Sequence, residues 1–477
     1  MQYETVIGLE VHVELSTASK IFCSCETTFG GDPNTHCCPV CTGLPGALPV
    51  LNQQVVDYAI RTCLATHCEI TPLTRFDRKN YFYPDLPKAY QISQLHKPIG
   101  RNGYLDIETA EGTKRIGIHE LHMEEDAGKL MHDPWEDCTL VDYNRCGVPL
   151  LEIVSEPDLR SAAEALAYLE KLRSILQVLG VSDCRMEQGS LRADVNVSVR
   201  PVGSPVFGTR TEMKNMNSFK AIGRAIVAEA KRQIELIEDG KAVRQETRRW
   251  DENKDSSFAM RSKEDAMDYR YFPDPDLVAI NITPDWIERV RVNLAELPES
   301  RRARYIADWQ LSAYEAEVLT TNPATANLFE ETTALSGKPK DAASWMLGEF
   351  MQALKDNECE PQDLYLPAQS LATLINRVAE GVVNRNTAKK IFAQILENKV
   401  DPDEYIEKNG LRMVSNPDAL KDKIAEIIAA NPQSVTDFKA GKAKAMGVLV
   451  GQVMKAMQGK ADPQLTNTLL KEALEKA

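Results

Sequence analysis

Residues 6–15 read VIGLEVHVEL, and apolar and polar side chains alternate strictly from Leu9 to Leu15. This period-2 pattern is typical of a β-strand with one side on an apolar core, so a sheet is expected to begin here. The polar side of the strand carries Glu10, His12 and Glu14. A solvated sheet face would explain these groups without any function, so the rest of the chain has to decide between the two interpretations.

Composition limits the class of protein. The chain has 477 residues, 43% hydrophobic and 26% charged, which is typical of a soluble protein with two to four domains. No apolar run approaches the roughly 18 residues that cross a bilayer, and MQYETVIG is not a signal sequence, so we expect a cytoplasmic protein without a membrane partner. Its 11 cysteines therefore favour thiols or metal ligands over disulfides. The formal charge of −14 confines any nucleic-acid contact to a local patch.

The order of the patterns predicts an α+β fold. Up to about residue 290 short alternating strands dominate, for example at 104–112 and 193–202, and two capped helices are expected at 161–180 and 217–240. From about residue 295 the strand patterns end and amphipathic helices follow. Breaks at Pro323, Lys338-Pro339 and 399–405 divide these helices, and the last break separates a small helical tail.

Several other segments repeat the acidic pattern of residues 6–15. Their polar side chains are His122, Glu124, Glu125 and Asp126; Asp194, Asn196 and Ser198; and Glu212, Lys214 and Asn215. Carboxylates with an occasional imidazole, arriving from separate strands, suit Mg²⁺ or Mn²⁺. Uncompensated like charges repel one another, so a divalent-metal site is favoured over solvated faces. Neither GxxxxGK[ST] nor GxGxxG is present, so a bound nucleotide would have to be held through metal and carboxylates.

The cysteines near the N-terminus have the spacing of a zinc knuckle. Cys23 and Cys25 form C-x-C, and Cys38 and Cys41 follow after twelve residues as C-P-V-C. Four thiolates in two close pairs fit a closed tetrahedral structural zinc site. The alternative is a set of reduced cysteines in a buried turn, and the adjacent Cys37 could replace one ligand.

A proline-broken loop at residues 78–94, RKNYFYPDLPKAYQISQ, collects basic, aromatic and amide side chains, among them Lys79 and Tyr81. Such a loop is either a recognition loop or an ordered aromatic surface turn.

Seven segments together resemble the family of B subunits of bacterial glutamyl/aspartyl-tRNA amidotransferases. They are VIGLEVHVEL, CPVCTGLPGALPVLN, RKNYFYPDLPKAYQISQ, LHMEEDAGK, VDYNRCGVPLLEIVSEPD, GSLRADVNVSVR and YRYFPDPDL, in this order. The resemblance implies a cradle-like antiparallel-sheet catalytic domain at 1–293, a helical domain at 294–403, and at 404–477 a tail domain that also occurs as a freestanding protein.

The resemblance also implies an activity, that of a carbon–nitrogen ligase with glutamine as nitrogen donor. ATP with Mg²⁺ would phosphorylate the side-chain carboxylate of Glu-tRNA(Gln) or Asp-tRNA(Asn), and ammonia would displace the phosphate. On this reading Glu10, His12, Asp194 and Glu212 are metal ligands. Neighbouring strand residues face opposite sides, so Glu124 and Glu125 cannot both point inward; Glu125 is preferred for the metal and the reaction, and Glu124 is second. Lys79, Tyr81 and Arg145 are candidate phosphate or substrate contacts.

The chain lacks both the GxCxG and the serine-rich GSSGG pattern of glutamine-hydrolysing enzymes. The resemblance supplies a glutaminase A subunit, which sends ammonia through a tunnel, and a small C subunit, making a heterotrimer. Two rival functions are a non-catalytic tRNA-binding scaffold and a metal-dependent nuclease. The acidic strands argue against the scaffold, and a nuclease would cleave tRNA with Mg²⁺ but without ATP.

Residues 438–460 gather positive charge in an otherwise balanced tail, with five lysines and no acidic residue. The candidate tRNA contacts there are Lys442, Lys444, Lys455 and Lys460. The lysine segments KAGKAK and QGK are expected in glycine loops around a buried MGVLVGQVM, where they can approach phosphates. A solvated helix edge is the alternative.

Overall fold

The computed structural model describes residues 2–133, 135–260, 269–413, 417–439, 443–457, 461 and 463–476. Contacts divide the chain into the units Met1–Pro298 and Glu299–Ala477. The described residues of the first unit form one apolar core, and those of the second form two separate apolar cores. The domain borders expected at 293/294 and 403/404 stay predictions.

Strand β1, the stretch that begins the chain, lies inside a large sheet. Within the described residues this sheet has nine strands. In spatial order they are β14 (Ser256–Ala259), β13 (Thr247–Asp251), β12 (Thr211–Lys214), β11 (Leu191–Pro201), β1 (Tyr3–Glu14), β10 (Pro149–Ser155), β7 (Gly112–Glu125), β6 (Gly100–Thr109) and β2 (Glu69–Ile70). All neighbours are antiparallel except β12 and β13. The α+β prediction is confirmed.

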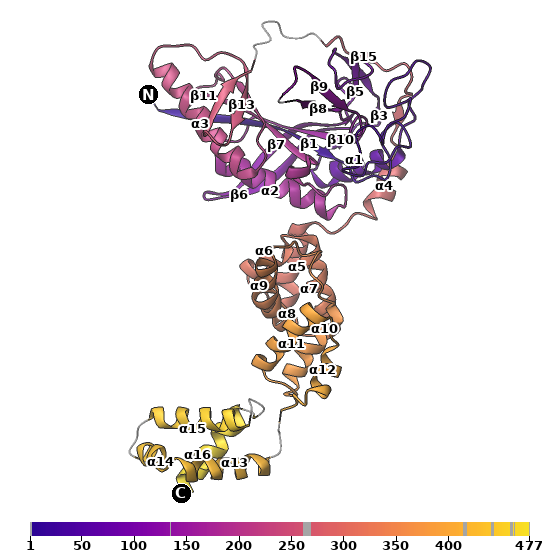
Figure 1. The fold of residues 1–477 in the computed structure, drawn as a ribbon. Coiled ribbons are helices and arrows are strands. Elements are labelled where there is room, and N and C mark those ends of the chain that lie inside the picture. Colours follow the sequence, from indigo (N-terminus) through magenta and orange to yellow (C-terminus); the bar gives the residue numbers. More distant parts are fainter. Residues whose placement is uncertain are drawn as a thin grey trace. The chain divides into compact units, whose positions relative to one another are not determined.

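Helices cover the apolar side of this sheet (Figure 1). They are α1 (Gln53–Ala65), α2 (Ala162–Val178) and α3 (Phe219–Glu238), which contact β7, β6 and β11 respectively. Val11, whose neighbours across the sheet are Ile153 and Ala193, is completely buried there. Burying this face is what drives the alternation of β1. Ser161 and Ser218 cap α2 and α3 as the sequence predicts.

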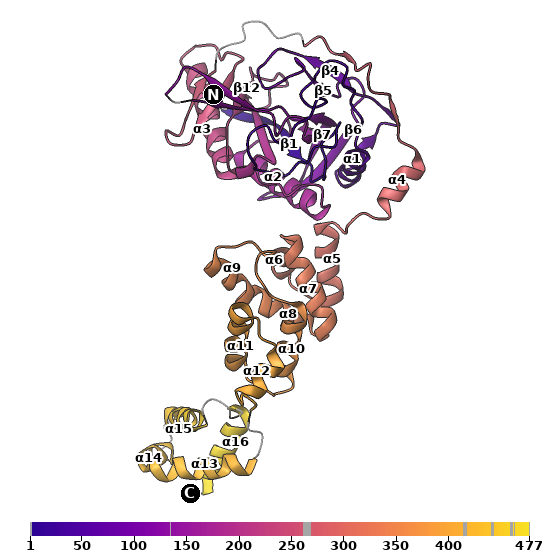
Figure 2. The ribbon, with the colours of Figure 1, turned by 45° about the vertical axis from the view of Figure 1, so that its right-hand side comes forward.

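Helix α1 was not predicted, although its signals are present. The Asn52 side chain accepts a hydrogen bond from the backbone of Gln54 at the start of the helix, and Val55, Val56, Ala59 and Ile60 form a buried stripe. The short helix α4 (Pro284–Arg291) packs on α1 (Figure 2).

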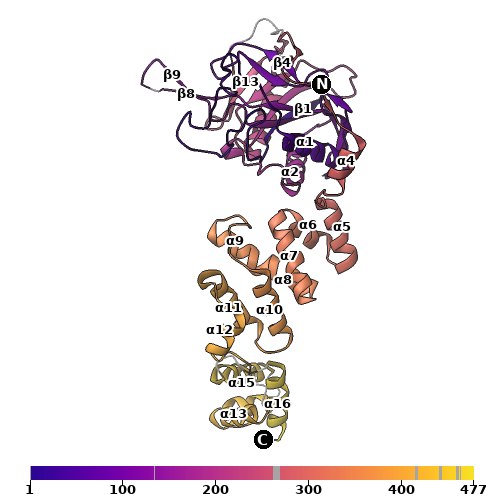
Figure 3. The same ribbon diagram turned by 90° about the vertical axis from the view of Figure 1, so that its right-hand side faces the viewer.

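Smaller elements complete the first unit. The three-stranded sheet β15 (Phe272–Pro273), β4 (Asp77–Asn80) and β5 (Tyr90–Ser93) contacts β7 through β5. The hairpin of β8 (Lys129–His132) and β9 (Thr139–Asp142) projects from the unit in Figure 3. The remaining elements are the pair β3 (Leu73–Thr74) and β16 (Ile280–Asn281), and the short 3₁₀ turn η1 (Met186–Gln188).

The described residues of the second unit contain only helices, as predicted. Around the first core lie α5 (Pro298–Trp309), α6 (Ala313–Thr320), α7 (Pro323–Ser336), α8 (Pro339–Trp345), the π-helical turn η2 (Met346–Phe350), α9 (Met351–Asn357), α10 (Ala368–Ala379), α11 (Arg385–Asn398) and α12 (Pro402–Lys408). The tail core joins α13 (Pro417–Ala430), α14 (Pro432–Lys439), α15 (Ala443–Ala456) and α16 (Pro463–Lys476). Helices α7, α8 and α12 begin at the predicted proline breaks. In the described part of the chain, no helix combines the length and apolarity that crossing a membrane requires.

Candidate active site

The polar side of the large sheet aligns charged residues from four adjacent strands. His12 of β1 pairs with Arg192 of β11 on one side and with Glu152 of β10 on the other, and Glu152 pairs with His122 of β7. Directly opposed residues of antiparallel strands have their Cβ atoms roughly 5 Å apart, so their side chains meet. The polar residues of these neighbouring strands therefore lie side by side on one side of the sheet.

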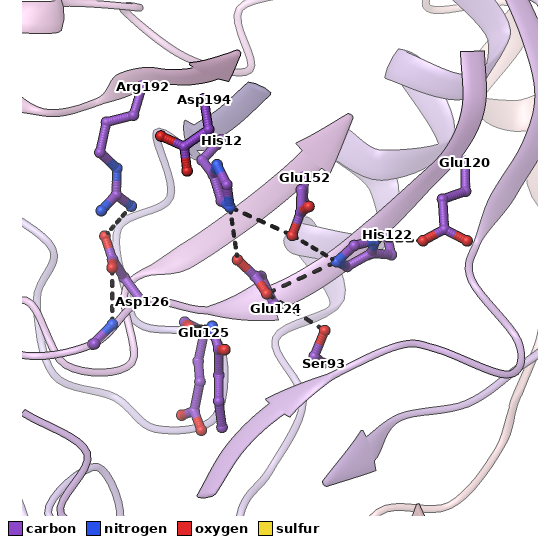
Figure 4. Close-up of polar contacts among 12 residues, drawn as sticks. His12, Ser93, Glu120, His122, Glu124, Glu125, Asp126, Glu152, Arg192 and Asp194 are labelled. Atoms are coloured by element: carbon purple, nitrogen blue, oxygen red, sulfur yellow. Dashed lines mark hydrogen bonds and ion pairs between the residues drawn. The ribbon is translucent and has the colours of Figure 1, made fainter. Parts of the chain in front are cut away.

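His12, His122 and Glu152, together with Glu124 of β7, form what we call the imidazole–carboxylate cluster (Figure 4). Glu152 Oε2 lies 3.4 Å from His12 Nε2 and 3.1 Å from His122 Nε2. Glu124 reaches the same two nitrogen atoms at 3.8 Å each. The cluster is largely hidden from water, since the Glu124 side chain is 4% exposed and that of His122 is 8% exposed.

The charges of this cluster control its proton affinities. Burial alone would raise the pKa of Glu152, but the two imidazoles outweigh burial and hold this pKa well below its ordinary value. Burial alone would lower the pKa of His12, but the hydrogen bond and charge of Glu152 raise it instead. The pKa of His122 is raised in the same way, mainly by Glu152. Without a metal ion, therefore, the carboxylates favour the protonated form of both imidazoles.

A second group, the Glu10 cluster, consists of Glu10, Asp194 and Glu212, whose carboxylates lie within 4.8 Å of one another. Lys214 Nζ contacts Asp194 at 2.8 Å and Glu212 at 3.0 Å. Asn196 donates a hydrogen bond of 2.9 Å to Glu10. Burial raises the pKa of Glu10, and repulsion from Glu152 raises it further, so an added cation would stabilise the ionised form.

Both clusters fit a divalent cation by donor chemistry. His12, Glu124 and Glu152 offer one imidazole nitrogen and two carboxylates within 4.8 Å, and the Glu10 cluster offers three carboxylates at the same spacing. Such donors suit Mg²⁺ or Mn²⁺. The sequence had predicted one shared ligand set, whereas the structure divides the ligands into two groups that follow one another along β1.

Glu124 and Glu125 lie differently from what the sequence analysis preferred. Figure 4 shows Glu124 pointing toward the imidazoles, while Glu125 points away from them. Both oxygens of Glu125 accept from Lys88 Nζ, at 2.5 and 2.6 Å, and one accepts from the backbone of Ile92 at 3.0 Å. Opposite side-chain direction along β7 is the physical reason, and the strand turns Glu124 to the face that His12 occupies.

Arg145 holds the backbone after β7. Its guanidinium donates to the carbonyls of Ala127 and Gly128 at 3.0 and 2.9 Å and lies 3.5 Å from Asp126. Glu14, at the end of β1, contacts the same carboxyl group, and burial together with the charge of Asp126 raises the pKa of Glu14 to about 8. Glu14 therefore lies beside Asp126, and it is absent from both candidate metal groups.

Lys79 and Tyr81 lie among aromatic rings. The Lys79 ammonium lies 5.0 Å from the ring centroid of Tyr269 and 5.8 Å from that of Tyr81. The two tyrosine rings meet edge to face at 5.6 Å. Burial raises the pKa of Tyr81, with a further contribution from Asp85, so its hydroxyl stays protonated and can donate a hydrogen bond. The 78–94 segment is thus ordered, and its lysine is partly desolvated by the rings.

The four predicted knuckle cysteines come together. Cys23, Cys25, Cys38 and Cys41 place their sulfur atoms within 4.8 Å of one another, and those of Cys38 and Cys41 are 4.0 Å apart. Tetrahedral zinc with bonds of about 2.3 Å requires roughly 3.8 Å between sulfurs, so the donor set fits.

The surroundings of Cys37 and Cys41 differ in ways that bear on zinc binding. Cys37 stands apart from this set, because its thiol contacts the carbonyl of Asn34 at 3.1 Å. A hydrogen bond from Cys23, assisted by the backbone of Cys38 and the charge of Lys20, lowers the pKa of Cys41 to about 4. Cys41 is therefore a thiolate, the form that binds metal.

The tail lysines are described only in part. Lys442 and Lys460 lie outside the described residues, and Lys444 falls in the first turn of α15 rather than in a loop. Lys455 is exposed in the last turn of α15. MGVLVGQVM was expected to be buried, and this holds for one side of α15 only: Leu449 and Val453 are fully buried in the tail core, whereas Val448 is 52% exposed.

Glu152, His122, Lys88 and Lys214 have site roles that the sequence analysis did not assign. Glu152 had a signal, since it is the acidic residue inside the otherwise apolar strand PLLEIV. Lys214 was noticed in the sequence among the polar residues of its segment, but the role of each lysine depends on which carboxylate it meets, and the sequence does not show that.

Comparisons with known proteins identify the family of this chain. The family model described as "GatB/GatE catalytic domain" matches residues 5–288, and the one described as "GatB domain" matches residues 327–474. A protein of Lachnoclostridium phytofermentans is 60% identical over 475 residues, covering 100% of this chain and 99% of its own. Proteins of Agathobacter rectalis, 57% identical with 99% of each chain covered, and Caldicellulosiruptor saccharolyticus, 56% identical with 100% of each covered, are also similar. All three are named as the B subunit of an aspartyl/glutamyl-tRNA(Asn/Gln) amidotransferase.

Proposed function

The chain belongs to the GatB/GatE family, and from this premise we propose that it amidates misacylated tRNA in an ATP-dependent reaction. The substrates are Glu-tRNA(Gln), Asp-tRNA(Asn) or both. The observation that carries the proposal is the pair of acidic clusters, side by side along β1, that can hold cations next to a phosphate chain.

The reaction has two steps. A side-chain carboxylate oxygen of the aminoacyl group bonds to the γ-phosphorus of ATP, and the bond to ADP breaks. Ammonia then bonds to the carbonyl carbon of the acyl phosphate, phosphate leaves, and the nitrogen loses a proton. The first step is needed because a carboxylate has no adequate leaving group.

The residues of the two clusters position these reactants. Divalent cations, when bound, would neutralise phosphate charge and align the transferred group. His12, Glu124 and Glu152 would hold one cation, and Glu10, Asp194 and Glu212 the other. Binding requires the His12 imidazole to lose the proton that Glu152 otherwise stabilises there.

Groups outside the clusters have separate tasks in this proposal. Lys79, held among the tyrosine rings, is placed to meet a carboxylate or phosphate, with Tyr81 as a hydrogen-bond donor. The four clustered cysteines bind a structural zinc ion that ties residues 23–41 together.

Partners must supply what the chain lacks. We infer a glutaminase A subunit as the source of ammonia and a small C subunit as the third member of a cytoplasmic complex. The lysines of the tail, Lys442, Lys444, Lys455 and Lys460, would contact the tRNA body.

The test is reconstitution with a glutaminase partner and each misacylated tRNA. His12→Ala or Glu10→Gln should abolish tRNA-dependent ATP cleavage while glutamine hydrolysis by the partner largely survives. His119→Ala is the matched control, since this imidazole lies on β7 outside both clusters and is 63% exposed. Substantial ATP turnover in both folded cluster variants would exclude this site. Cleavage of tRNA with Mg²⁺ and without ATP would favour a nuclease.

A further inference from the structure

The zinc knuckle contacts a second segment of the chain through the loop between its two cysteine pairs. This loop, residues 26–37, is called the knuckle loop below. It lies against residues 141–144, at the end of β9. Hydrogen bonds of Asn34, in the knuckle loop, and of Asn144, after β9, join the two segments.

The Asn34 side chain takes the place of a neighbouring strand. Its Nδ2 donates to the carbonyl of Val141 at 3.0 Å, and its Oδ1 accepts from the backbone N–H of Tyr143 at 2.8 Å. Its own backbone N–H donates to Asp142 Oδ1 at 3.0 Å. Asn34 has a φ of 63°, a left-handed conformation that asparagine adopts more readily than most residues. One residue of the knuckle loop therefore fixes three consecutive positions, 141–143.

Two further contacts support the same segment from the knuckle. Asn144 Oδ1 accepts from the backbone N–H of His36 at 2.8 Å. The Lys20 side chain is completely buried, and its Nζ lies 3.7 Å from Cys41 Sγ and 3.4 Å from the carbonyl oxygen of Tyr143. The position of Tyr143 is therefore set from the knuckle through its N–H and through its carbonyl.

Tyr143 in turn holds the loop between β4 and β5, residues 81–89. Its hydroxyl donates to the carbonyl of Pro84 at 2.9 Å, and the next carbonyl, that of Asp85, accepts from the N–H of Gly128 at 2.9 Å. A Cβ on Gly128 would lie 3.0 Å from Cδ1 of the Tyr143 ring. The ring, Gly128 and residues 84–85 are thus packed closely together.

A second contact joins the knuckle to the 81–89 loop. Gly43 lies two residues after Cys41 and has a φ of 67°. A Cβ there would lie 2.4 Å from Lys88 Cγ and 3.2 Å from Lys88 Cα, so only glycine permits this approach. The knuckle therefore supports the loop at two places, near Pro84 and at Lys88.

The 81–89 loop borders the imidazole–carboxylate cluster. Lys79 and Tyr81 lie at its start, and Ser93 Oγ, after its end, lies 3.4 Å from Glu124 Oε2. Groups that act on a substrate must be held to within about 0.5 Å of their productive positions. Contacts that fix this loop therefore bear on the reaction as well as on local stability.

We propose that Asn34 and Tyr143 are positioning residues, which hold the 81–89 loop in place for the aminoacyl group of the tRNA. Zinc, when bound, would fix the knuckle loop on which Asn34 lies. The proposal rests on the proposed amidation of tRNA and gives the knuckle a task in that reaction. A knuckle that stabilised only its own residues would leave the 81–89 loop unchanged, and this difference can be measured.

Two substitutions in the full-length protein remove the contacts with little other change. Asn34→Gly deletes the carboxamide but keeps the left-handed backbone, which glycine adopts without strain. Tyr143→Phe deletes only the hydroxyl that reaches Pro84. Asn102→Gly is the matched control for the first, since this exposed asparagine of β6 also has a positive φ, 52°. Tyr314→Phe, in α6 and 71% exposed, is the control for the second.

Hydrogen exchange followed by mass spectrometry would report on the loop directly, with zinc bound and after its removal by a chelator. Tyr143→Phe should speed exchange in residues 81–89 about fivefold, the typical effect of losing one neutral hydrogen bond. Asn34→Gly should keep its zinc in metal analysis and exchange faster in both 81–89 and 139–146. Zinc removal from the unsubstituted protein should have the same effect, and both controls should exchange normally in these segments.

A kinetic measurement separates positioning from general stability. In the reconstituted complex, Tyr143→Phe should raise the KM for misacylated tRNA about fivefold, with kcat unchanged. Loss of a contact made equally with substrate and transition state changes KM alone. Glutamine hydrolysis by the partner and the melting temperature should match those of Tyr314→Phe.

Three results would overturn the proposal. Unchanged exchange in 81–89 after zinc removal would confine the knuckle to local stability. Faster exchange of Asn34→Gly in 139–146 alone would mean that the contacts end at β9. A lower kcat with unchanged KM in Tyr143→Phe would place the hydroxyl in the chemical step. Absence of amidation by the unsubstituted complex would instead overturn the proposed function, and the exchange data would still decide whether the knuckle holds the loop.

Discussion

Substitution of Glu124 should weaken metal binding, whereas substitution of Glu125 should lower the stability of the fold. The carboxylate of Glu125 is 3% exposed and is paired with a Lys88 ammonium that is 11% exposed. Glu125→Gln leaves this ammonium buried without its counter-charge, and breaking such a pair costs about 3–5 kcal/mol. The Glu125 charge is also what raises the pKa of Lys88 against the effect of burial.

The magnitude follows from the size of the first unit. Unfolding entropy of about 2.1 cal/mol/K per residue means that one kcal/mol shifts the melting temperature of a unit spanning Met1–Pro298 by about 1.6 °C. A loss of about 3 kcal/mol therefore predicts a fall of about 5 °C for Glu125→Gln. Glu124→Gln should change the melting temperature little, because the two imidazoles keep Glu152 as their partner. It should instead weaken Mn²⁺ binding at least about tenfold, since even outer-sphere partners contribute that much.

The assays are thermal unfolding of the metal-free protein and calorimetric titration with Mn²⁺. Glu124→Gln and Glu125→Gln are matched controls for each other, since both remove one charge from adjacent positions of β7. The assignment of Glu124 to the metal would be wrong if Glu125→Gln lost Mn²⁺ while keeping its melting temperature. It would fail equally if Glu124→Gln bound Mn²⁺ normally.

Three further predictions concern stability, zinc and tRNA. Burial opposes ionisation of Glu229, but hydrogen bonds, led by that of Arg232, outweigh burial and lower the pKa of Glu229. The ionised carboxylate therefore stabilises the folded protein above about pH 4.5, and this stabilisation is lost as the pH falls through the lowered pKa. Glu229→Gln should therefore cost about 3 kcal/mol at pH 7 in urea unfolding and less in acid. Cys38→Ser should lose the zinc found by metal analysis, whereas Cys37→Ser should keep it. Removal of residues 417–477, which carry helices α13 to α16 of the tail core, should weaken tRNA binding at low salt. The loss should shrink as salt rises because phosphate contacts release counterions.

Each of these has its own control. Glu235→Gln removes a 63% exposed carboxylate from the same helix and should leave the pH profile unchanged. A pH-independent loss in Glu229→Gln would contradict the ionic explanation. Zinc retained by Cys38→Ser, or lost equally from Cys37→Ser, would contradict the ligand set. Equal tRNA affinity of the truncated and full-length complexes at low salt would remove the tail from tRNA binding.

Much of the fold was predictable because local rules agree with the tertiary structure. The alternation at residues 6–15 predicted β1, the serine caps predicted α2 and α3, and the proline breaks marked the starts of α7, α8 and α12. Helix α1 was not predicted from the sequence. Its capping residue Asn52 follows a proline-rich segment, and such a segment indicates a loop rather than the start of a helix.

The candidate site divides in the same way. The sequence by itself determined that Glu10, His12 and Glu14 share one side of β1 and that Glu124 and Glu125 point to opposite sides of their strand, because side-chain direction alternates with position alone. It did not determine which of Glu124 and Glu125 faces His12. The sequence also predicted which four cysteines come together, because the short spacing within each pair keeps its two thiols close. Only the tertiary structure decided that Glu124 meets His12, that Glu125 pairs with Lys88, and that Glu10 joins a separate group with Asp194 and Glu212. The physical reason is that strand order and register are long-range properties: residues 12, 124 and 152 become neighbours only when β1, β10 and β7 pair, and no local pattern encodes that pairing.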